Sequence, residues 1–235
     1  MKEDRCTIDI ETIMDSLPQP LPRHIPPEVN VQPGHRWRIL RKGGVCILGS
    51  QEPSVHSLEQ AYRVGRLIAE RLKLPVVTLP QKGVSERAAA GAARARGWII
   101  VVKGWANPPL LFPSSSRVSE RCIIAAPLPW HDPGLSYGKV YAMRDSLLAA
   151  LSRALILIEP APSSVAFKQA LLLLSLKRST AVIRPIDESY DFKLALKRLK
   201  AAAERYRVEL DVVEEAGEAV EAVSRLVELP GLTVA

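Results

Sequence analysis

Short apolar runs rich in valine and isoleucine recur along the chain from residue 43 onward. They cover residues 45–49, 75–79, 98–104, 121–126, 154–159, 180–185 and 208–213. Within most of these runs apolar residues follow one another without alternating polar positions. This pattern is typical of strands that are buried on both faces of a parallel sheet.

Between most of the runs, apolar residues recur at the three- to four-residue spacing that predicts a helix. Helices are expected at residues 56–73, 83–97, 138–152, 164–177, 190–206 and 215–228. Gly97 is expected at the position just after its helix, where a left-handed residue often ends the turn. Strands that alternate with helices predict the α/β fold class, as a doubly wound, mostly parallel, Rossmann-like sheet.

The first 42 residues follow another pattern. Prolines crowd the stretch from residue 18 to residue 33, namely Pro18, Pro20, Pro22, Pro26, Pro27 and Pro33. Proline fixes φ and lacks a backbone donor, so we expect neither regular helix nor sheet in this stretch. A short helix from Ile8 to Leu17 is expected before it. We therefore divide the chain into a Pro-rich N-terminal arm, 1–42, and a Rossmann-like domain, 43–235, whose tail from about residue 186 is helix, strand and helix.

The arm either lies on the body of the protein or tethers it. At its end, basic residues surround Trp37 in the segment HRWRILRKGG, residues 35–44. Such a segment can grip a nucleic-acid backbone and stack a base. The interpretation that we favour is that Trp37 anchors the arm to the core while the charges stay in solvent.

Composition limits the class of protein. The chain has 235 residues, 47% of them hydrophobic, and no apolar run approaches the roughly 20 residues of a membrane span. The charged N-terminus lacks the apolar core of a signal peptide, so we expect a cytoplasmic protein without a membrane partner. The three cysteines are far apart and the four histidines have no metal spacing, which predicts neither disulfide nor metal site. The scarcity of asparagine is a compositional hint of a thermophile.

The net charge is +7 at pH 7. Such an excess favours an anionic partner, nucleic acid above all, although a generally basic surface without a dedicated partner has the same composition. The basic run on the helix expected at 190–206 is open to the same two interpretations.

Several motifs then follow one another in a defined order. LGSQEPS at 48–54 joins a strand end to a helix start. KGVSERAAAGAARARGWIIVVKG at 82–104 places Lys-Gly before a helix with a Gly-Ala pair and then a strand that ends in glycine. The later motifs are Phe112-Pro113, residues 144–152, the strand that ends at Glu159, and Ser164-Val165-Ala166. Their ordered spacing over about 140 residues resembles the Rossmann-like domain of the DprA/Smf family of DNA-processing proteins.

The resemblance implies a homodimer that binds single-stranded DNA, helps to load a recombinase and needs no cofactor. The chain departs from the family at its basic motifs. Gln51 stands where the first loop of the family has arginine, and Lys82 replaces the arginine of the second loop. Only Arg144 remains of an Arg-Asn-Arg triplet, and Val165 fills a glycine position.

The sequence contains no P-loop, no GxSxG and no HExxH motif. Glu159 is the one well-placed acid, and an acid at a strand end either acts as a base or caps the next helix. We therefore predict no catalytic residue and favour a protein without enzymatic activity.

Phosphates bind to lysine, arginine and the free amides at helix starts. The candidate nucleic-acid-binding residues are Ser50, Lys82, Gly83, Lys139 and Arg144. Alternatively, they are residues near helix starts that are exposed to solvent and bind no ligand. Trp105, Trp130, Tyr137 and Tyr141 either stack bases or anchor loops.

Two other functions stay open. One is a sensor or hydrolase of nucleotide derivatives, since the resemblance extends to a phosphoribohydrolase branch of the same fold. That branch uses a glycine-rich loop, whereas EPAPSSVAFKQ at 159–169 contains no glycine. The other is a degenerate scaffold subunit.

Overall fold

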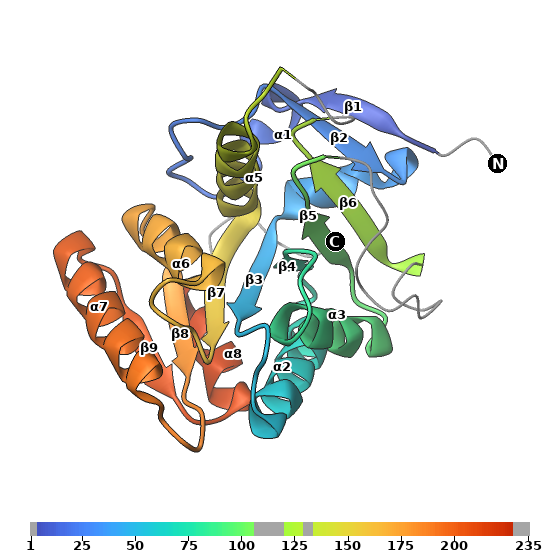
Figure 1. Ribbon diagram of the computed structural model, residues 1–235. Helices are drawn as coiled ribbons and strands as arrows, with labels where there is room; N and C mark the ends of the chain where they lie inside the picture. The colour runs from blue at the N-terminus through green and yellow to red at the C-terminus, as the bar shows by residue number, and fades with distance from the viewer. Residues whose placement is uncertain (1–3, 106–119, 129–133, 228–235) are drawn as a thin grey trace.

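The computed structural model describes residues 4–105, 120–128 and 134–227, and one sheet runs through all of it (Figure 1). In spatial order its nine strands are β1 (Cys6–Asp9), β2 (Glu28–Gln32), β6 (Cys122–Ala126), β5 (Ile99–Val102), β4 (Val76–Thr78), β3 (Gly44–Gly49), β7 (Ser152–Ile158), β8 (Ser179–Ile183) and β9 (Leu210–Val213). From β6 to β9 neighbouring strands are parallel. The predicted doubly wound, mostly parallel α/β fold is confirmed.

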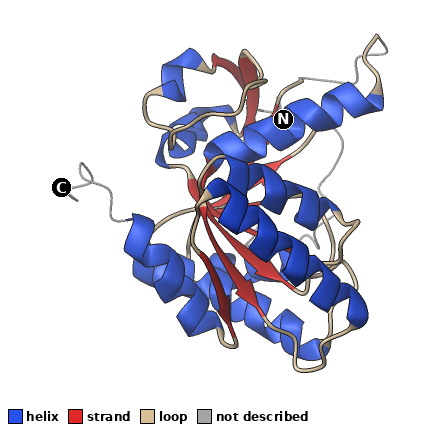
Figure 2. Ribbon diagram, turned by 90° about the vertical axis from the view of Figure 1, so that its left-hand side faces the viewer, coloured by secondary structure: helices blue, strands red, loops and turns tan. Residues whose placement is uncertain are grey.

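Helices cover both faces of the sheet, as Figure 2 shows. One face carries α2 (Val55–Leu67) with its π-helical continuation η2 (Ile68–Leu72), α3 (Val84–Arg94) and α8 (Ala216–Val227). The other face carries α5 (Tyr137–Leu151), α6 (Val165–Ser175) and α7 (Tyr190–Tyr206). Along β3, Val45 and Ile47 face the first layer while Cys46 and Leu48 face the second. Burial on both faces explains why the strand runs are apolar throughout.

The winding of the sheet reverses between β3 and β7. From β3 the chain proceeds to β4, β5 and β6 on one side, and later to β7, β8 and β9 on the other. In doubly wound sheets, ligands bind beyond the carboxyl ends of the strands at such a reversal. The chain leaves β3, β4, β5 and β7 at this C-terminal edge.

The N-terminal segment corrects two expectations. It adds β1 and β2 to the sheet as antiparallel strands, with β2 paired to β6. Strand β2 forms inside the proline-rich stretch because Pro27 and Pro33 flank it and leave five consecutive residues free to pair. The helix expected from Ile8 to Leu17 is reduced to α1 (Glu11–Met14), since β1 already holds Cys6 to Asp9.

The same segment is part of the hydrophobic core. Ile13, Leu17 and Leu40 are buried in the cluster that also contains α5. Trp37, in the 3₁₀ helix η1 (Gly34–Lys42), packs partly buried against this cluster. The interpretation of Trp37 as an anchor is therefore confirmed. Arg36, whose charge was expected to stay in solvent, instead lies 5.3 Å from the centre of the Trp98 ring.

Two arginines at the starts of β7 and β8 hold the segment in place. The guanidinium of Arg178 is buried and donates hydrogen bonds to three successive carbonyls, those of Pro18, Gln19 and Pro20. Arg153 donates to the carbonyl of Lys42 over 2.6 Å. Burial, together with the charge of Arg153, lowers the pKa of Arg178 to about 10, so Arg178 stays protonated at neutral pH.

Helix α3 ends differently from the expectation. The left-handed residue after it is Arg96, with φ of 57°, and the amide of Gly97 donates to the carbonyl of Ala92 over 2.8 Å. Gly97 serves close packing instead, because a Cβ there would lie 2.4 Å from Cβ of Ala69. In the described part of the chain, no helix is both long and apolar enough to cross a membrane.

We predict that Arg178→Ala lowers the free energy of unfolding by about 2–4 kcal/mol, because three carbonyls lose their donor and some of them stay buried. Arg178→Lys, which keeps the charge but not the planar fork, is expected to recover only part of the loss. Urea unfolding followed by circular dichroism measures both. Arg198→Ala, at an exposed position of α7, is the control and should change stability by less than about 0.5 kcal/mol. Wild-type stability of Arg178→Ala would show that the segment is held by other contacts.

Candidate nucleic-acid interface

The loop after β3 uses the polar groups of Ser50 internally. The Ser50 amide donates to the carbonyl of Ile158 over 3.2 Å, and its hydroxyl oxygen accepts from the amide of Glu52 over 3.1 Å. Its carbonyl accepts from the amide of Val84, also over 3.1 Å. Ser50 therefore fixes the loop and joins it to the start of α3.

Gly83 brings the second loop onto the first. Its φ is 76°, and a Cβ at this position would lie 2.6 Å from the carbonyl oxygen of Ser50 and 2.7 Å from that of Gln51. Only glycine fits both the backbone conformation and the space. The structure thus places three predicted residues, Ser50, Lys82 and Gly83, next to one another, with Lys82 exposed. The exposed Glu52 lies in the same first loop and adds a negative charge to it.

Glu159 occupies the point where the sheet winding reverses. Its carboxylate accepts hydrogen bonds from the amide and the hydroxyl of Ser54, over 3.1 and 3.2 Å. Ser54 is in turn the N-cap of α2 and accepts from the amide of Ser57. A carboxylate at a helix start is stabilised by the positive end of the helix dipole. Glu159 therefore has a capping contact, and the helix that it caps is α2 and not α6, which follows it in the chain.

The other two predicted residues lie on α5. Lys139 is exposed in the first turn, where its amide donates to the hydroxyl of the N-cap Ser136 over 3.4 Å. Arg144 donates from Nε and Nη2 to Oδ1 of Asp145, over 2.8 and 2.6 Å. Burial raises the pKa of Asp145, while the contact with Arg144 opposes that rise. Arg144 thus already has an anionic partner in this structure.

Three aromatic rings meet beyond the end of β5. The Trp105 ring lies edge-on to that of Tyr137, with centroids 5.5 Å apart, and 6.4 Å from that of Tyr141. Tyr137 and Tyr141 are 62% and 44% exposed, and the guanidinium of Arg144 lies 4.7 Å from the Tyr141 ring centre. From the sequence, each of these rings was considered as a separate candidate for stacking. The two tyrosines are four residues apart on one helix, and this spacing indicates that their rings lie on one surface.

The predicted residues do not form a single cradle. Helix α3 covers one face of the sheet and α5 the other, so Lys82 and the α5 residues flank the C-terminal edge from two sides.

Lys103, at the end of β5, was missed by the sequence analysis. It is only 5% exposed, and burial lowers its pKa. Phe112, Pro113 and Trp130, which also belong to the sequence hypothesis, lie outside the described residues.

A metal centre has no support in the part of the chain that the structure describes. Within residues 4–105, 120–128 and 134–227 no group of three or more histidine, cysteine or acidic side chains could hold a metal ion. The thiols of Cys46 and Cys122 are buried, and burial raises their pKa to about 12, so they stay protonated.

Known structures share this arrangement of strands and helices. DNA processing protein A (DprA) from Streptococcus pneumoniae matches with a TM-score of 0.66 at 15% identity, over 92% of this chain and 73% of its own. DprA from Helicobacter pylori matches with a TM-score of 0.67 at 16% identity, over 95% of this chain and 97% of its own. The chain has the fold of DprA. The resemblance found in the sequence is thereby confirmed at the level of fold.

The DprA-like fold also occurs in proteins with other ligands. The molybdenum cofactor binding protein from Rippkaea orientalis matches with a TM-score of 0.56 at 16% identity, over 78% of this chain and 96% of its own. The Helicobacter pylori protein is described as binding single-stranded DNA. The chain matches no family model and no curated protein. The fold alone therefore does not decide the function.

We predict that Gly83→Ala lowers the free energy of unfolding by about 2–4 kcal/mol, because the methyl group meets two carbonyl oxygens and the backbone conformation is strained. Differential scanning calorimetry should show a lower melting temperature. Gly138→Ala is the matched control, since a Cβ there meets nothing within 4 Å. Its melting temperature should stay level or rise. Equal melting temperatures for both variants would contradict the packing of the second loop on the first.

Proposed function

We propose that the protein binds single-stranded DNA, without enzymatic activity, in DNA processing or recombination. The observation that carries the proposal is the cluster of Trp105 with the exposed Tyr137 and Tyr141 at the C-terminal edge, beside the basic residues of α5. Flat rings next to positive charge are the combination by which proteins hold unpaired bases and their phosphates.

The two tyrosines supply the base contacts. Tyr137 and Tyr141 lie one turn apart on α5, and Trp105 packs edge-on against both. This packing orders the exposed rings before a strand arrives, which reduces the entropy that binding must remove. Stacking of a base on such a ring contributes about 1–3 kcal/mol and is tolerant of sequence.

The phosphate contacts come from both flanks of the edge. Lys82 at the start of α3 and Lys139 in the first turn of α5 are exposed lysines at helix starts, where the dipole favours an anion. Ser50 and Gly83 support this arrangement by holding the start of α3 in place. Arg144 reaches a phosphate after exchanging its partner Asp145. The excess of seven positive charges over the whole chain favours the approach of a polyanion.

The alternative of a nucleotide-derivative sensor or hydrolase receives less support. A small nucleotide in a doubly wound sheet places its phosphate at the reversal of winding, near the starts of α2 and α6. Here Glu159 holds that position with its own carboxylate, and the loop from 159 to 164 has no glycine to let a phosphate approach. A homodimer and a recombinase partner stay predictions of the resemblance to DprA.

Fluorescence anisotropy with labelled oligo-dT over a salt series tests the proposal. Lys82→Ala should weaken binding and make the slope of log K against log salt less negative by about 0.7, the value for one phosphate of a single strand. Tyr137→Ala and Tyr141→Ala should each weaken binding about tenfold with little change of slope, because stacking releases no counterions.

Matched controls lie on α7. Lys193→Ala removes an exposed lysine and Tyr190→Ala an exposed tyrosine, 79% exposed, both from outside the proposed site. Both should bind like the wild type. If each control weakens binding as much as its counterpart, the site is misplaced. If the wild type fails to bind at low salt, the proposed function is refuted, and the nucleotide sensor and the scaffold remain.

A separate prediction concerns the partner of Arg144. Asp145→Asn removes the carboxylate that neutralises Arg144, so oligo-dT should bind a few-fold more tightly at low salt. In the double variant Arg144→Ala/Asp145→Asn this gain should disappear. The same anisotropy assay measures both variants. A gain that persists without Arg144 would show that the general loss of negative charge, and not Arg144, is responsible.

A further inference from the structure

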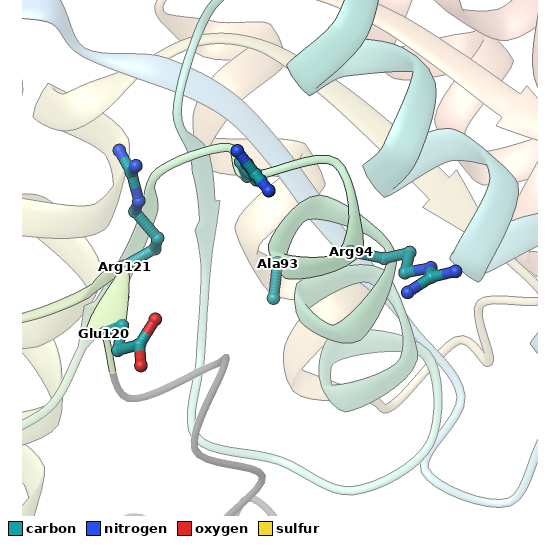
Figure 3. A pocket seen from close by; sticks show the side chains of 5 residues that line it. Ala93, Arg94, Glu120 and Arg121 are labelled. Atoms are coloured by element: carbon teal, nitrogen blue, oxygen red, sulfur yellow. The ribbon is translucent and has the colours of Figure 1, made fainter.

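A hollow of about 460 Å³ lies at the opposite edge of the sheet, where β5 and β6 begin. The end of α3 and the segment that leads into β6 form its walls, and its lining residues are Ala93, Arg94, Arg96, Glu120 and Arg121. Figure 3 shows Ala93 and Arg94 on the helix, with Glu120 and Arg121 on the facing segment. The candidate interface of the preceding sections contributes no residue to it.

The arginines of the hollow have no carboxylate partner among the described residues. Neither Arg94 nor Arg96 forms an ion pair or hydrogen bond there, and both are exposed. Elsewhere in the described chain arginines do pair with acids, namely Arg63, Arg66, Arg144, Arg184 and Arg225. The hollow therefore gathers guanidinium groups that the fold itself leaves available.

The third arginine is held by an aromatic ring. The guanidinium of Arg121 lies 5.1 Å from the centre of the Trp98 ring, and that of Arg36 lies 5.3 Å from it. Arg36 also donates a hydrogen bond to the carbonyl of Glu120. Cation–π contacts of this kind fix the guanidinium while leaving N–H groups at its rim to donate.

The backbone around the hollow is fixed as well. The amide of Ile99 donates to the carbonyl of Arg121 over 2.9 Å, which joins the starts of the two strands. Arg96 is in a left-handed conformation, and the adjacent Gly97 amide closes the helix end on Ala92. Arg94 and Arg96 therefore extend from an ordered turn, and in Figure 3 the Arg94 side chain points away from Arg121.

The net charge of the residues that line the hollow is positive, even when the nearby negative charges are included. Three arginines and one acid, Glu120, line the hollow together with the C-terminal end of α3, which acts as about half a negative charge. About one and a half positive charges remain. Guanidinium groups bind phosphate oxygens in a bidentate fork, so a phosphate-bearing ligand satisfies both the charge and the geometry.

We propose that this hollow, defined by Arg94, Arg96 and Arg121, binds backbone phosphates of a single-stranded nucleic acid. The lining is charged, and the nearby Trp98 ring already packs against Arg36 and Arg121, so the hollow recognises phosphates and offers no face to a base. A strand with successive phosphates fits such a surface better than one mononucleotide does. The inference rests on the proposed function for the nature of the strand, but it adds a second contact at the other edge of the sheet.

Anisotropy with labelled oligo-dT over a salt series tests the inference in the full-length protein. Arg94→Ala/Arg96→Ala should weaken binding about tenfold and make the salt slope less negative by about 1.4, as expected for two phosphates. Arg94→Lys/Arg96→Lys should restore the slope but only part of the affinity, because lysine keeps the charge and loses the fork. Lys197→Ala/Arg198→Ala removes two exposed charges from α7 and serves as the matched control.

Each outcome separates the two proposals. If only the Arg94/Arg96 variant loses affinity, the inference stands and the site around Lys82 falls. If only Lys82→Ala loses affinity, the inference is overturned and the proposed function stands. A wild type that fails to bind oligo-dT overturns both. Equal losses in the α7 control and the Arg94/Arg96 variant overturn the inference, because the effect is then one of net charge.

Discussion

Helices α2 and α3 cross with their backbones in contact, and the geometry of the C-terminal edge depends on this contact. A Cβ at Gly65 would lie 2.0 Å from the carbonyl oxygen of Ala88, and one at Gly91 would lie 2.0 Å from that of Tyr62. No side chain fits at either point, so the two helices pack directly on one another. This close packing leaves Gly83 on the loop of Ser50, where the Val84 amide reaches the Ser50 carbonyl.

This close packing also changes the chemistry of the first loop. Doubly wound sheets usually leave the helix starts at the reversal of winding open to an anion. Here the amide and hydroxyl of Ser54 are occupied by Glu159, and the three polar groups of Ser50 are occupied by neighbours. The loop that begins with Gly49 and Ser50 is thus an architectural element whose anion is the protein's own carboxylate. Exposed cationic and aromatic side chains lie farther out, with Lys139, Tyr137 and Tyr141 on α5.

Most of the fold could be predicted from the sequence, because buried parallel strands are apolar without interruption and the helices between them are amphipathic. Strand β2 could not, since prolines on both sides of it mask a run of only five residues. The site was harder still. Glu159 and Ser54 are 105 positions apart in sequence, and only the parallel pairing of β3 with β7 brings them together. Arg144 and Asp145 are adjacent in sequence, yet their ion pair depends on side-chain conformations that periodicity does not report.

The two edges differ in what a phosphate must displace. At the C-terminal edge a phosphate that reaches Arg144 has to replace Asp145, whose two short contacts are lost in the exchange. At the N-terminal edge Arg94 and Arg96 give up only water, because within the described chain they have no anionic partner. Exchange of one charged partner for another yields little net free energy, whereas an exposed guanidinium without an anionic partner exchanges only water for the phosphate. If the protein binds single-stranded DNA as proposed, the contact at the N-terminal edge therefore costs no existing ion pair, and the aromatic rings of α5 supply contacts that salt does not weaken.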